Sequence, residues 1–461
     1  MTTDQILYKQ AKRAWEDAAS FRSRRRRLKA FAYGKQWDDT IVTSDGRRLT
    51  EAQRAIEEGR TPITNNIIRR MIKCILGRYS RLTAAEHQSP NDHGRETTPF
   101  SPITERDSRA LEELLISGST IQYVDRETGV IDNISPDRFL FRRFARTDAS
   151  DCTLLGVLRD WPLDDVLLRF SDRSPHRAAK IRALYHGHDS TVTPVPFLSA
   201  ATSTDFTQPM LPGTVRVIEV WKRRAVELLR VHDPLSAEYK MIDAHRLDLL
   251  TRLNARRKSR GLPELSITYD IARAWVCTML SPNGTVLDTF TADNHPFAVR
   301  FYPMIDGEVH SAVEDVVDQQ KLINRLVSTL DQIIASSAKG VLLYPADQLP
   351  DGFTWRDVRR IWSNPSGILP FKRTSRNLTP QQVNHSANSS GATELLRTQL
   401  EIFDEIAGAT ASFRGRSAGS YGEGVLRAEM ENALTSMLDI LNTFHEFIKQ
   451  RDKLTTLKSV A

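Results

Sequence analysis

The chain has few cysteines and no long apolar run, and each absence argues against a class of protein. Its three cysteines, Cys74, Cys152 and Cys277, lie far apart without Cys-x-x-Cys spacing, which argues against a zinc site or a disulfide framework. No run of 18 or more apolar residues occurs, and the first thirty or so residues lack the apolar centre of a signal peptide. We therefore expect reduced thiols, no membrane span and a protein that stays in the cytoplasm.

Motifs of catalysis are also scarce. No GxxxxGK[ST] sequence is present, and Gly419–Gly424 has the wrong spacing for a loop that binds phosphate. Gly415–Gly419 matches Gly-x-Ser-x-Gly, but no buried strand is expected before it, as a nucleophile elbow requires. His186 and His188 have no identifiable third and fourth metal ligand nearby. The sequence predicts no enzyme activity, no cofactor and no metal.

The charge balance is modestly basic. The 64 basic and 57 acidic residues give a net charge of +7 and a pI near 9.3, which suits contact with nucleic acid. The basic residues cluster in two runs: Arg22, Arg24, Arg25, Arg26, Arg27 and Lys29, and Arg252, Arg256, Arg257, Lys258 and Arg260. Charge runs carry no geometry for reading bases, so both are interpreted as solvated or intersubunit faces.

The pattern of the first 305 residues predicts an α+β lobe. Apolar periodicity predicts helices over Asp4–Phe31, Asn65–Tyr79 and Glu105–Ser117, the last closed by Gly118. From Thr120 the period becomes alternating, which is typical of strands. Later features are a helix beginning at Pro162, a Ser/Thr/Pro-rich loop over His186–Gly213, a strand over Val215–Trp221, and a hairpin of Ala274–Leu280 with Thr285–Phe290.

The remaining chain reads as helix, insert, helix, glycine-rich loop and helix. Ser311–Lys339 predicts one amphipathic helix about 43 Å long. A second periodic run stops at Gly408, and a third starts near Val425. In the insert we expect strands at Val341–Tyr344 and Gly367–Pro370 and a helix over Thr354–Trp362. The insert is too small for a core of its own, so it is expected to pack against neighbouring copies.

The densest carboxylate cluster is Glu314, Asp315 and Asp318. Glu314 and Asp318 are expected one turn apart on the long helix, where they could hold Mg²⁺. This would make the chain a metal-dependent nucleic-acid-processing enzyme. The simpler interpretation is that acidic residues in a first helical turn are favoured by the helix dipole, typically by roughly 0.3–1 kcal/mol, without a metal.

The order of several motifs resembles that of tailed-bacteriophage portal proteins, the head-to-tail connectors of phage particles. The motifs are Tyr33–Trp37 (YGKQW), Gly59–Ile68 (GRTPITNNII), Ile75–Gly77, Ala110–Gly118, Ile134–Phe139 (ISPDRF), Asn294–Gly307 (NHPFAVRFYPMIDG), His310–Ser311, Asp318–Arg325 (DQQKLINR) and Gly408–Gly415. They extend over most of the chain, and their succession is more specific than any one of them.

The resemblance implies a portal-like α+β fold and a ring oligomer. The implied parts are a mixed α/β wing (1–305), a first stem helix (306–340), a small α/β clip (341–387), a second stem helix (388–409), a tunnel loop (410–424) and a C-terminal helix (425–461). The chain ends about a dozen residues after Phe447, so the crown beyond this helix is expected to be short or absent.

The implied function is a dodecameric channel at one capsid vertex, through which double-stranded DNA is packaged and ejected without sequence reading. The implied partners are further copies of the chain, the large terminase, the major capsid and scaffolding proteins and tail adaptor proteins, with no membrane. The implied location is the virion, after assembly in the host cytoplasm. A head-to-tail adaptor ring remains an alternative, although adaptors are generally shorter and lack the helix, insert, helix succession.

Two groups of site residues follow from the resemblance. The tunnel loop carries Arg414 and Arg416 with Phe413 and Tyr421, which could touch phosphates and bases briefly in the channel. The opposing interpretation is that Arg414 pairs with an acidic residue of a neighbouring copy. The clip residues proposed to dock terminase or adaptor are Trp355, Arg356, Arg359, Arg360 and Trp362, although ordinary core or intersubunit packing also explains the two tryptophans.

Overall fold

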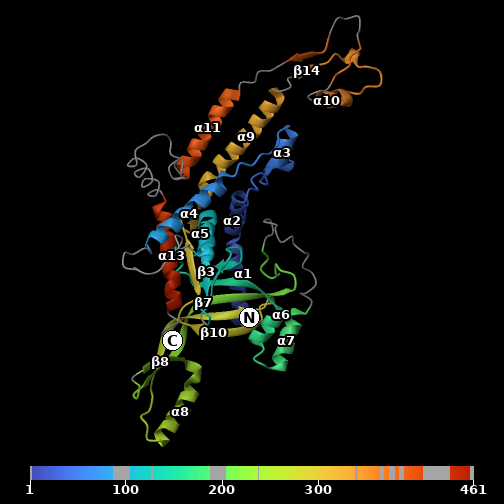
Figure 1. The fold of residues 1–461 in the computed structure, drawn as a ribbon. Coiled ribbons are helices and arrows are strands. Elements are labelled where there is room, and N and C mark those ends of the chain that lie inside the picture. The colour runs from blue at the N-terminus through green and yellow to red at the C-terminus, as the bar shows by residue number, and fades with distance from the viewer. Residues whose placement is uncertain are drawn as a thin grey trace, which may run out of the picture. The chain divides into compact units, whose positions relative to one another are not determined.

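The computed structural model describes residues 3–86, 104–125, 128–186, 204–236, 238–337, 341–363, 368–372, 379–383, 389–408 and 437–456. The chain divides into two compact units, which are each built from segments distant in sequence (Figure 1). The first unit comprises Met1–Ala32, Met71–Asp315 and Ser412–Ala461, and the second comprises Tyr33–Arg70 and Val316–Ala411. The segment Tyr33–Arg70, expected in the wing, therefore clusters with the helices that follow residue 315.

Among the described residues of the first unit, six antiparallel strands form the main sheet, in the order β10-β9-β7-β6-β5 with β8 on the far end of β7. The strands are β5 (Phe139–Phe141), β6 (Leu154–Pro162), β7 (Thr214–Asp233), β8 (Glu238–Asp243), β9 (Ser266–Leu280) and β10 (Val286–Ala292). The predicted hairpin of β9 and β10 is confirmed, and β7 extends well beyond the predicted end at Trp221.

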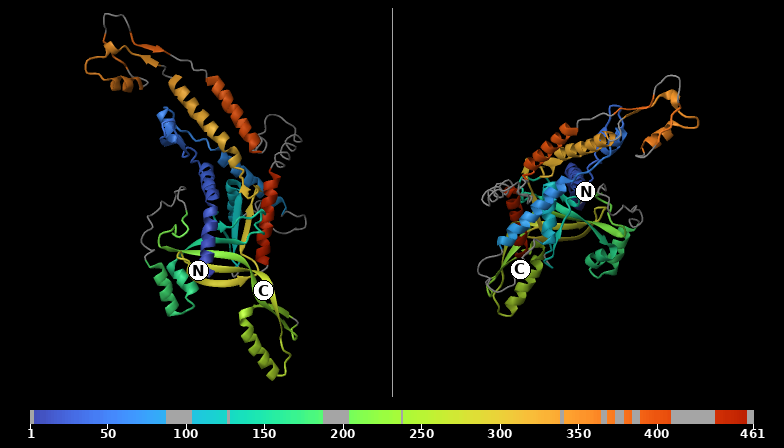
Figure 2. Two further views of the ribbon diagram at one scale, coloured as in Figure 1. Left: turned by 180° about the vertical axis from the view of Figure 1, so that it is seen from behind. Right: turned by 45° about the horizontal axis from the view of Figure 1, so that its top comes forward.

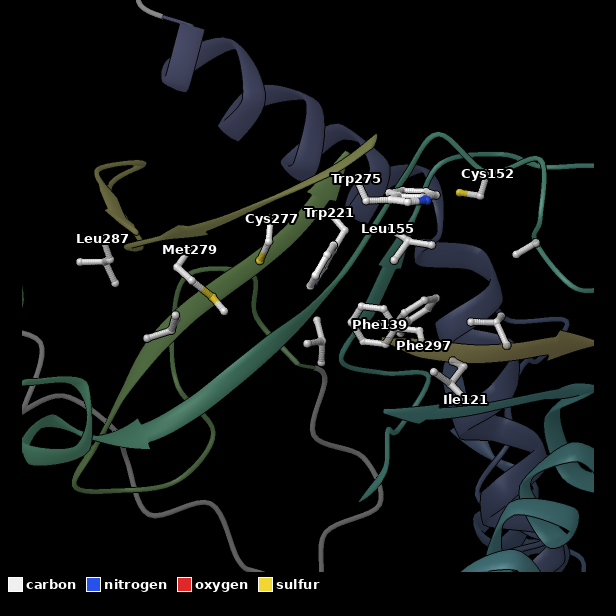
Figure 3. Packing of buried hydrophobic residues seen from close by; sticks show 14 of the residues in the cluster. Ile121, Phe139, Cys152, Leu155, Trp221, Trp275, Cys277, Met279, Leu287 and Phe297 are labelled. Atoms are coloured by element: carbon white, nitrogen blue, oxygen red, sulfur yellow. The ribbon is translucent and has the colours of Figure 1, made fainter. Parts of the chain in front are cut away.

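Alternation along β7 divides the core between the two faces of this sheet. Val217 and Trp221 point into a cluster with residues of β3 (Ser119–Val124), β11 (Phe297–Phe301), α6 (Leu163–Phe170) and α7 (Pro175–Tyr185). Figure 3 shows part of this cluster, in which Trp221 and Cys277 lie near Phe139 and Phe297. Ile218 and Val220 point to the other face, which α1 (Thr3–Asp17) covers. Around the first half of β7 the sheet is therefore buried on both sides.

A second, three-stranded sheet has the order β11-β3-β4, with β4 at Ile131–Asn133. The chain then forms a short hairpin of β12 (Met304–Ile305) and β13 (Glu308–Val309). Helix α5 (Glu105–Ser117) has the predicted bounds, because Thr104 caps its start and Gly118, at φ 68°, ends it. A Cβ at Gly118 would lie 2.6 Å from the carbonyl oxygen of His310, so only glycine fits there.

The predicted helix over Asp4–Phe31 is two helices, α1 and α2 (Ala19–Ala32). A side-chain contact lies at the break. Arg22 Nη1 donates to the carbonyl oxygen of Trp15 at 2.7 Å, and its guanidinium lies 3.5 Å from the Trp15 ring centroid. This contact supplies an N–H donor near the end of α1, where backbone carbonyls need partners.

Arg25 of α2 is also buried, with 4% of its side chain exposed. Its Nε and Nη2 each donate to Glu113 at 2.7 Å, and its Nη1 donates to Asp137 at 2.5 Å. The interpretation of this arginine run as a solvated or intersubunit face is therefore wrong for Arg22 and Arg25. Both are internal because nearby acceptors satisfy their guanidinium groups.

The end of the main sheet carries a small lobe that the sequence did not predict. Beyond β8 in sequence lie a 3₁₀ turn (Ala244–Arg246) and α8 (Leu247–Ser259), which packs beside the far ends of β7 and β9 (Figures 1 and 2). Leu229, Val231, Leu250 and Leu265 form a separate core there. The second basic run of the sequence belongs to this helix and the turn after it.

The last described helix of the first unit is α13 (Leu438–Thr456). Its Phe444 and Phe447 are fully buried, and Phe444 makes an edge contact with Tyr79 of α4 (Ile67–Glu86), with ring centroids 5.3 Å apart. The third predicted helix started near Val425, but 425–436 lie outside the described residues.

In the second unit, α9 (Val317–Ser337) and α11 (Ser389–Ile406) pack side by side and flank the insert. The insert contains β14 (Val341–Leu343), a 3₁₀ turn (Ala346–Gln348), α10 (Trp355–Ser363) and β15 (Gln381–Val383). β14 pairs antiparallel with β15. The predicted strand at Gly367–Pro370 is wrong, since 368–370 have no regular structure.

The N-terminal segment of the second unit is mostly extended. It forms the hairpin of β1 (Thr40–Val42) and β2 (Arg48–Thr50), then α3 (Glu51–Glu57), and it ends in the first turn of α4. No helix in the described part of the chain is long and apolar enough to cross a membrane.

Candidate channel and docking surfaces

Three sequence motifs that are distant in the chain meet on α9 of the second unit. Three α9 side chains, each at most 1% exposed, accept hydrogen bonds from every second backbone N–H of an extended segment before α4. The bonds join Ile63 N to Ser328 Oγ, Asn65 N to Asn324 Oδ1 and Ile67 N to Gln320 Oε1, and each donor–acceptor distance is 3.0 Å. We call Gln320, Asn324 and Ser328 the polar ladder.

The geometry of the polar ladder follows from two repeats that nearly match. Four residues of α-helix rise about 6.0 Å, and two residues of extended chain rise about 6.6 Å. Helical side chains at i, i+4 and i+8 can therefore accept hydrogen bonds from alternate backbone N–H groups of one extended segment, as the carbonyl groups of a neighbouring strand would. Gln320 Nε2 also donates to the carbonyl oxygen of Asn65 at 2.6 Å, and Asn324 Nδ2 donates to Gln36 Oε1 at 2.6 Å. Gln36 belongs to the YGKQW motif.

The residues that follow Gln320 and Asn324 on α9 are cationic. Lys321 Nζ lies 2.5 Å from Asp39 and 2.8 Å from Glu51, and Arg325 lies 3.2 Å from the second oxygen of Glu51. Glu51 is buried at the start of α3, and Thr50 and Gln53 form a capping box there. These contacts attach the β1–β2 hairpin and α3 to the long helix.

The sequence contained a signal for this site that we did not use. The stripe of α9 that is apolar elsewhere carries polar residues at 320, 324 and 328, a spacing of four. Polar side chains repeated on one buried face of a helix need partners, and those partners must come from another segment.

The insert leaves several large apolar side chains in solvent. Leu343, Trp355, Ile368 and Phe371 are 53%, 51%, 87% and 45% exposed. The Tyr344 hydroxyl donates to the carbonyl oxygen of Pro370 at 2.6 Å, and the Tyr344 ring contacts the edge of Trp355. In the described part of the insert, these exposed side chains leave the apolar core incomplete.

Helix α10 presents two different faces. Trp355, Val358 and Trp362 share one face, at i, i+3 and i+7, and of these Val358 is buried and Trp362 half-buried. The predicted docking arginines share the adjoining face, and all three are exposed: Arg356, Arg359 and Arg360. The structure thus brings the predicted docking residues onto one helix, with Arg359 one turn after Trp355.

A cap fixes the start of α10. Asp357 Oδ2 accepts from the hydroxyl and the N–H of Thr354 at 2.6 and 3.0 Å, and Asp357 N donates to Thr354 Oγ1 at 3.3 Å. The hydrogen bond from the Thr354 side chain, with smaller contributions from its N–H and from Arg360 and Arg356, lowers the pKa of Asp357 below its usual value. The carboxylate therefore stays charged beside the arginines.

The predicted tunnel-loop residues Phe413, Arg414, Arg416 and Tyr421 lie outside the described residues, as does His188. The predicted relation of Glu314 to Asp318 is wrong, since α9 begins at Val317 and Glu314 lies in a preceding 3₁₀ turn (Glu314–Val316).

The carboxylates of that turn contact basic groups of the first unit. His310 Nε2 is 2.6 Å from Asp315, His310 Nδ1 is 3.4 Å from Glu314, and Arg24 is 4.0 Å from Glu314. Within the described residues, no three His, Cys, Asp or Glu side chains are grouped so as to hold a metal ion.

Comparison with known proteins gives one family match. The family model described as phage P22-like portal protein matches residues 120–444. The matched range runs from β3, through both long helices and the insert, into α13. No curated protein matches the chain.

Proposed function

Since the chain belongs to the phage P22-like portal protein family, we propose that its copies form a dodecameric ring at one capsid vertex, with a channel through which double-stranded DNA is packaged and ejected. The portal family is structural rather than enzymatic. The single observation that carries the proposal is the match over 120–444, which includes the succession of helix, insert and helix that a ring of this family would use.

In the proposed ring, α9 and α11 are the stem helices and pack beside those of neighbouring copies. Their exposed apolar residues support this. Ile334 is 61% exposed, and Leu395 and Ile406 are each 45% exposed, in the single chain. Covering each such side chain contributes roughly 1–2 kcal/mol per copy, and a ring built from head-to-tail contacts leaves no open end.

The proposed domains keep the predicted bounds. Residues 1–305 are the wing, 306–340 the first stem helix, 341–387 the clip, 388–409 the second stem helix, 410–424 the tunnel loop and 425–461 the C-terminal helix. The association of Tyr33–Arg70 with α9 in one compact unit adds that this part of the wing would move with the stem.

We propose that the clip docks the large terminase during packaging and tail adaptor proteins afterwards. The exposed Trp355 and the arginine face of α10 support this, because aromatic and arginine residues are enriched where proteins bind. The incomplete apolar core of the insert also supports packing against neighbouring clips.

We propose that DNA contacts in the channel are weak and independent of sequence. Helix α11 exposes Glu394, Glu401 and Glu405, and carboxylates beside DNA repel its phosphates and so disfavour tight binding. Arg414 and Arg416 would supply brief phosphate contacts, and Phe413 and Tyr421 brief stacking. The capsid and scaffolding proteins would surround the ring, which would assemble in the host cytoplasm and remain in the virion.

Negative-stain microscopy of the purified chain tests the ring. We expect rings with a central hole, and Leu395→Glu with Ile406→Glu should abolish them because the proposed stem contacts would bury charge. Leu168→Glu is the matched control, since Leu168 is 83% exposed on α6 of the first unit. Uniform monomers of the unaltered chain under conditions that promote assembly would contradict the proposal.

A further inference from the structure

Helix α8 has one face that holds it to its own lobe. Leu250, Asn254 and Arg257, at i, i+4 and i+7, point inward. Leu250 is buried, and Asn254 both donates to the carbonyl oxygen of Leu265 at 3.0 Å and accepts from its N–H at 2.8 Å. Arg257 binds Asp233 through two hydrogen bonds of 2.7 and 2.8 Å. These contacts fix which face of the helix is turned toward the lobe.

The adjoining face of α8 has no such contacts. Leu249 and Leu253 are 62% and 44% exposed, and Arg252 and Arg256 are exposed beside them. These four residues follow i, i+3, i+4 and i+7 and therefore form one stripe, which we call the outer stripe. Within the described residues, no ion pair involves Arg252 or Arg256, whereas Arg257 and Lys258 on other sides of the helix are paired.

The chemistry of the outer stripe restricts what it can bind. Two leucines one turn apart match the spacing with which an amphipathic helix packs against another helix. The flanking arginines would repel a second copy of the same stripe. Phosphates of DNA would pair with the arginines but would leave the leucines against a charged backbone, so DNA would contact only the arginines favourably. A helix with apolar residues between carboxylates would contact both the leucines and the arginines favourably.

We propose that the outer stripe of α8 docks an acidic amphipathic helix of another protein. Leu249 and Leu253 pack against its apolar face, and Arg252 and Arg256 pair with carboxylates at its edges. The role goes beyond the portal channel, since α8 takes part in none of the contacts proposed for the stem or the clip. A helix on a separate lobe can bind a partner without disturbing the main sheet.

Fluorescence anisotropy with a labelled peptide tests the proposal on the full chain. The probe is a synthetic peptide on the order of 20 residues, long enough to form a helix on binding, with leucines at i, i+4 and i+7 and glutamates around them. A scrambled peptide of the same composition is the control ligand. The altered chains are Leu249→Ala with Leu253→Ala, and Arg252→Glu with Arg256→Glu.

Each double substitution should weaken peptide binding at least about tenfold. The matched control variants are Leu247→Ala, which removes an exposed leucine from another side of α8, and Lys240→Glu on β8. Both should bind within about twofold of the unaltered chain. Unchanged circular dichroism of all variants ensures that the lobe is folded, as expected for exposed positions.

Four results would overturn the proposal. These are no binding of the patterned peptide, equal binding of the scrambled peptide, equal losses in the control variants, or self-association of the chain, measured by sedimentation velocity, that the leucine substitutions abolish. Preferential binding of a double-stranded DNA fragment that depends on the arginines and not on the leucines would assign the stripe to nucleic acid instead.

Discussion

Two arginine-rich helices of this protein look alike in sequence and differ in the structure. In α2 of the first unit, Arg22 and Arg25 are buried and bind acceptors of their own chain. In α10 of the second unit, Arg356 and Arg359 are exposed. The difference lies in the surroundings: Glu113 and Asp137 come from other elements to meet Arg25, whereas Arg360 of α10 lies 3.5 Å from Asp357 of its own helix.

The buried arginines contribute to the stability of the subunit, whereas the exposed arginines are available to bind partners. Helix α2 satisfies its buried arginines within one chain, while the insert of the second unit leaves arginines and apolar side chains exposed. A portal must be stable as a subunit and also contact other proteins, and these two helices suit the two demands. The following substitutions test the division, beginning with the largest expected effect.

Arg25→Ala should lower the free energy of unfolding by about 3–5 kcal/mol, because it leaves the Glu113 and Asp137 carboxylates without their buried cation. Arg359→Ala is the matched control and should change it by less than about 0.5 kcal/mol. Urea denaturation followed by circular dichroism measures both. Equal changes in the free energy of unfolding would show that the arginines of α2 contribute no more to stability than those of α10.

Gln320→Leu should lower the free energy of unfolding by about 3 kcal/mol, because it leaves the N–H of Ile67 and the carbonyl oxygen of Asn65 without their hydrogen-bond partner. Hydrogen exchange should become faster at the amides of residues 63–68. Gln332→Leu, at an exposed position of the same helix, should change neither quantity. Unaltered exchange at 63–68 in Gln320→Leu would show that the polar ladder does not hold this segment.

Acid should weaken the first unit through Glu113. Burial opposes ionisation of this carboxyl, but the charge and hydrogen bonds of Arg25 outweigh burial and lower its pKa. A lowered pKa in the folded state contributes stability above the unfolded value of about 4.3, and this contribution is lost as the pH falls through the folded value.

Glu113→Gln should therefore be less stable than the unaltered chain at pH 7, and the gap should narrow between roughly pH 5 and pH 2. Thermal unfolding midpoints across this range measure the gap. A gap that stays constant with pH would mean that the ion pair with Arg25 does not depress the pKa of Glu113.

The smallest effect on stability is expected in α10. Replacing Arg356, Arg359 and Arg360 together by Glu should change the thermal midpoint little, because all three are exposed. Binding of the large terminase to assembled rings should nevertheless be lost if the clip docks it. Retained binding, measured by co-sedimentation, would move the docking site elsewhere.

Some elements could be predicted because their signals are local. Helix α5 has a capping threonine before it and a glycine after it, and both ends have the predicted bounds. The β9–β10 hairpin has alternating residues on both sides of a Pro-Asn-Gly turn. The α+β composition follows from such segments taken together.

Other elements depend on contacts that no local pattern records. The break between α1 and α2 contains neither proline nor glycine, and it is stabilised by Arg22 reaching back to Trp15. β15 has the sequence Gln-Gln-Val, which does not predict a strand, and it forms by pairing with β14 between the adjacent ends of α9 and α11. Tertiary contact overrides local preference in both cases.

The candidate site was predicted unevenly for the same reason. The helix that carries the clip residues could be predicted because its period is local, and the docking role of these residues stays a prediction. The polar ladder was missed because its meaning depends on a segment more than 250 residues away in sequence. The tunnel-loop assignment of Arg414 and Arg416 rests on the family resemblance and stays a prediction.

The central claim is that many copies of this chain surround a channel lined by their paired long helices. A cryo-electron microscopy reconstruction of the purified assembly tests it most directly. The account predicts a closed ring with α9 and α11 of each copy around the bore and the insert at one end. A ring with these helices on its outer rim, or no ring at all, would contradict it.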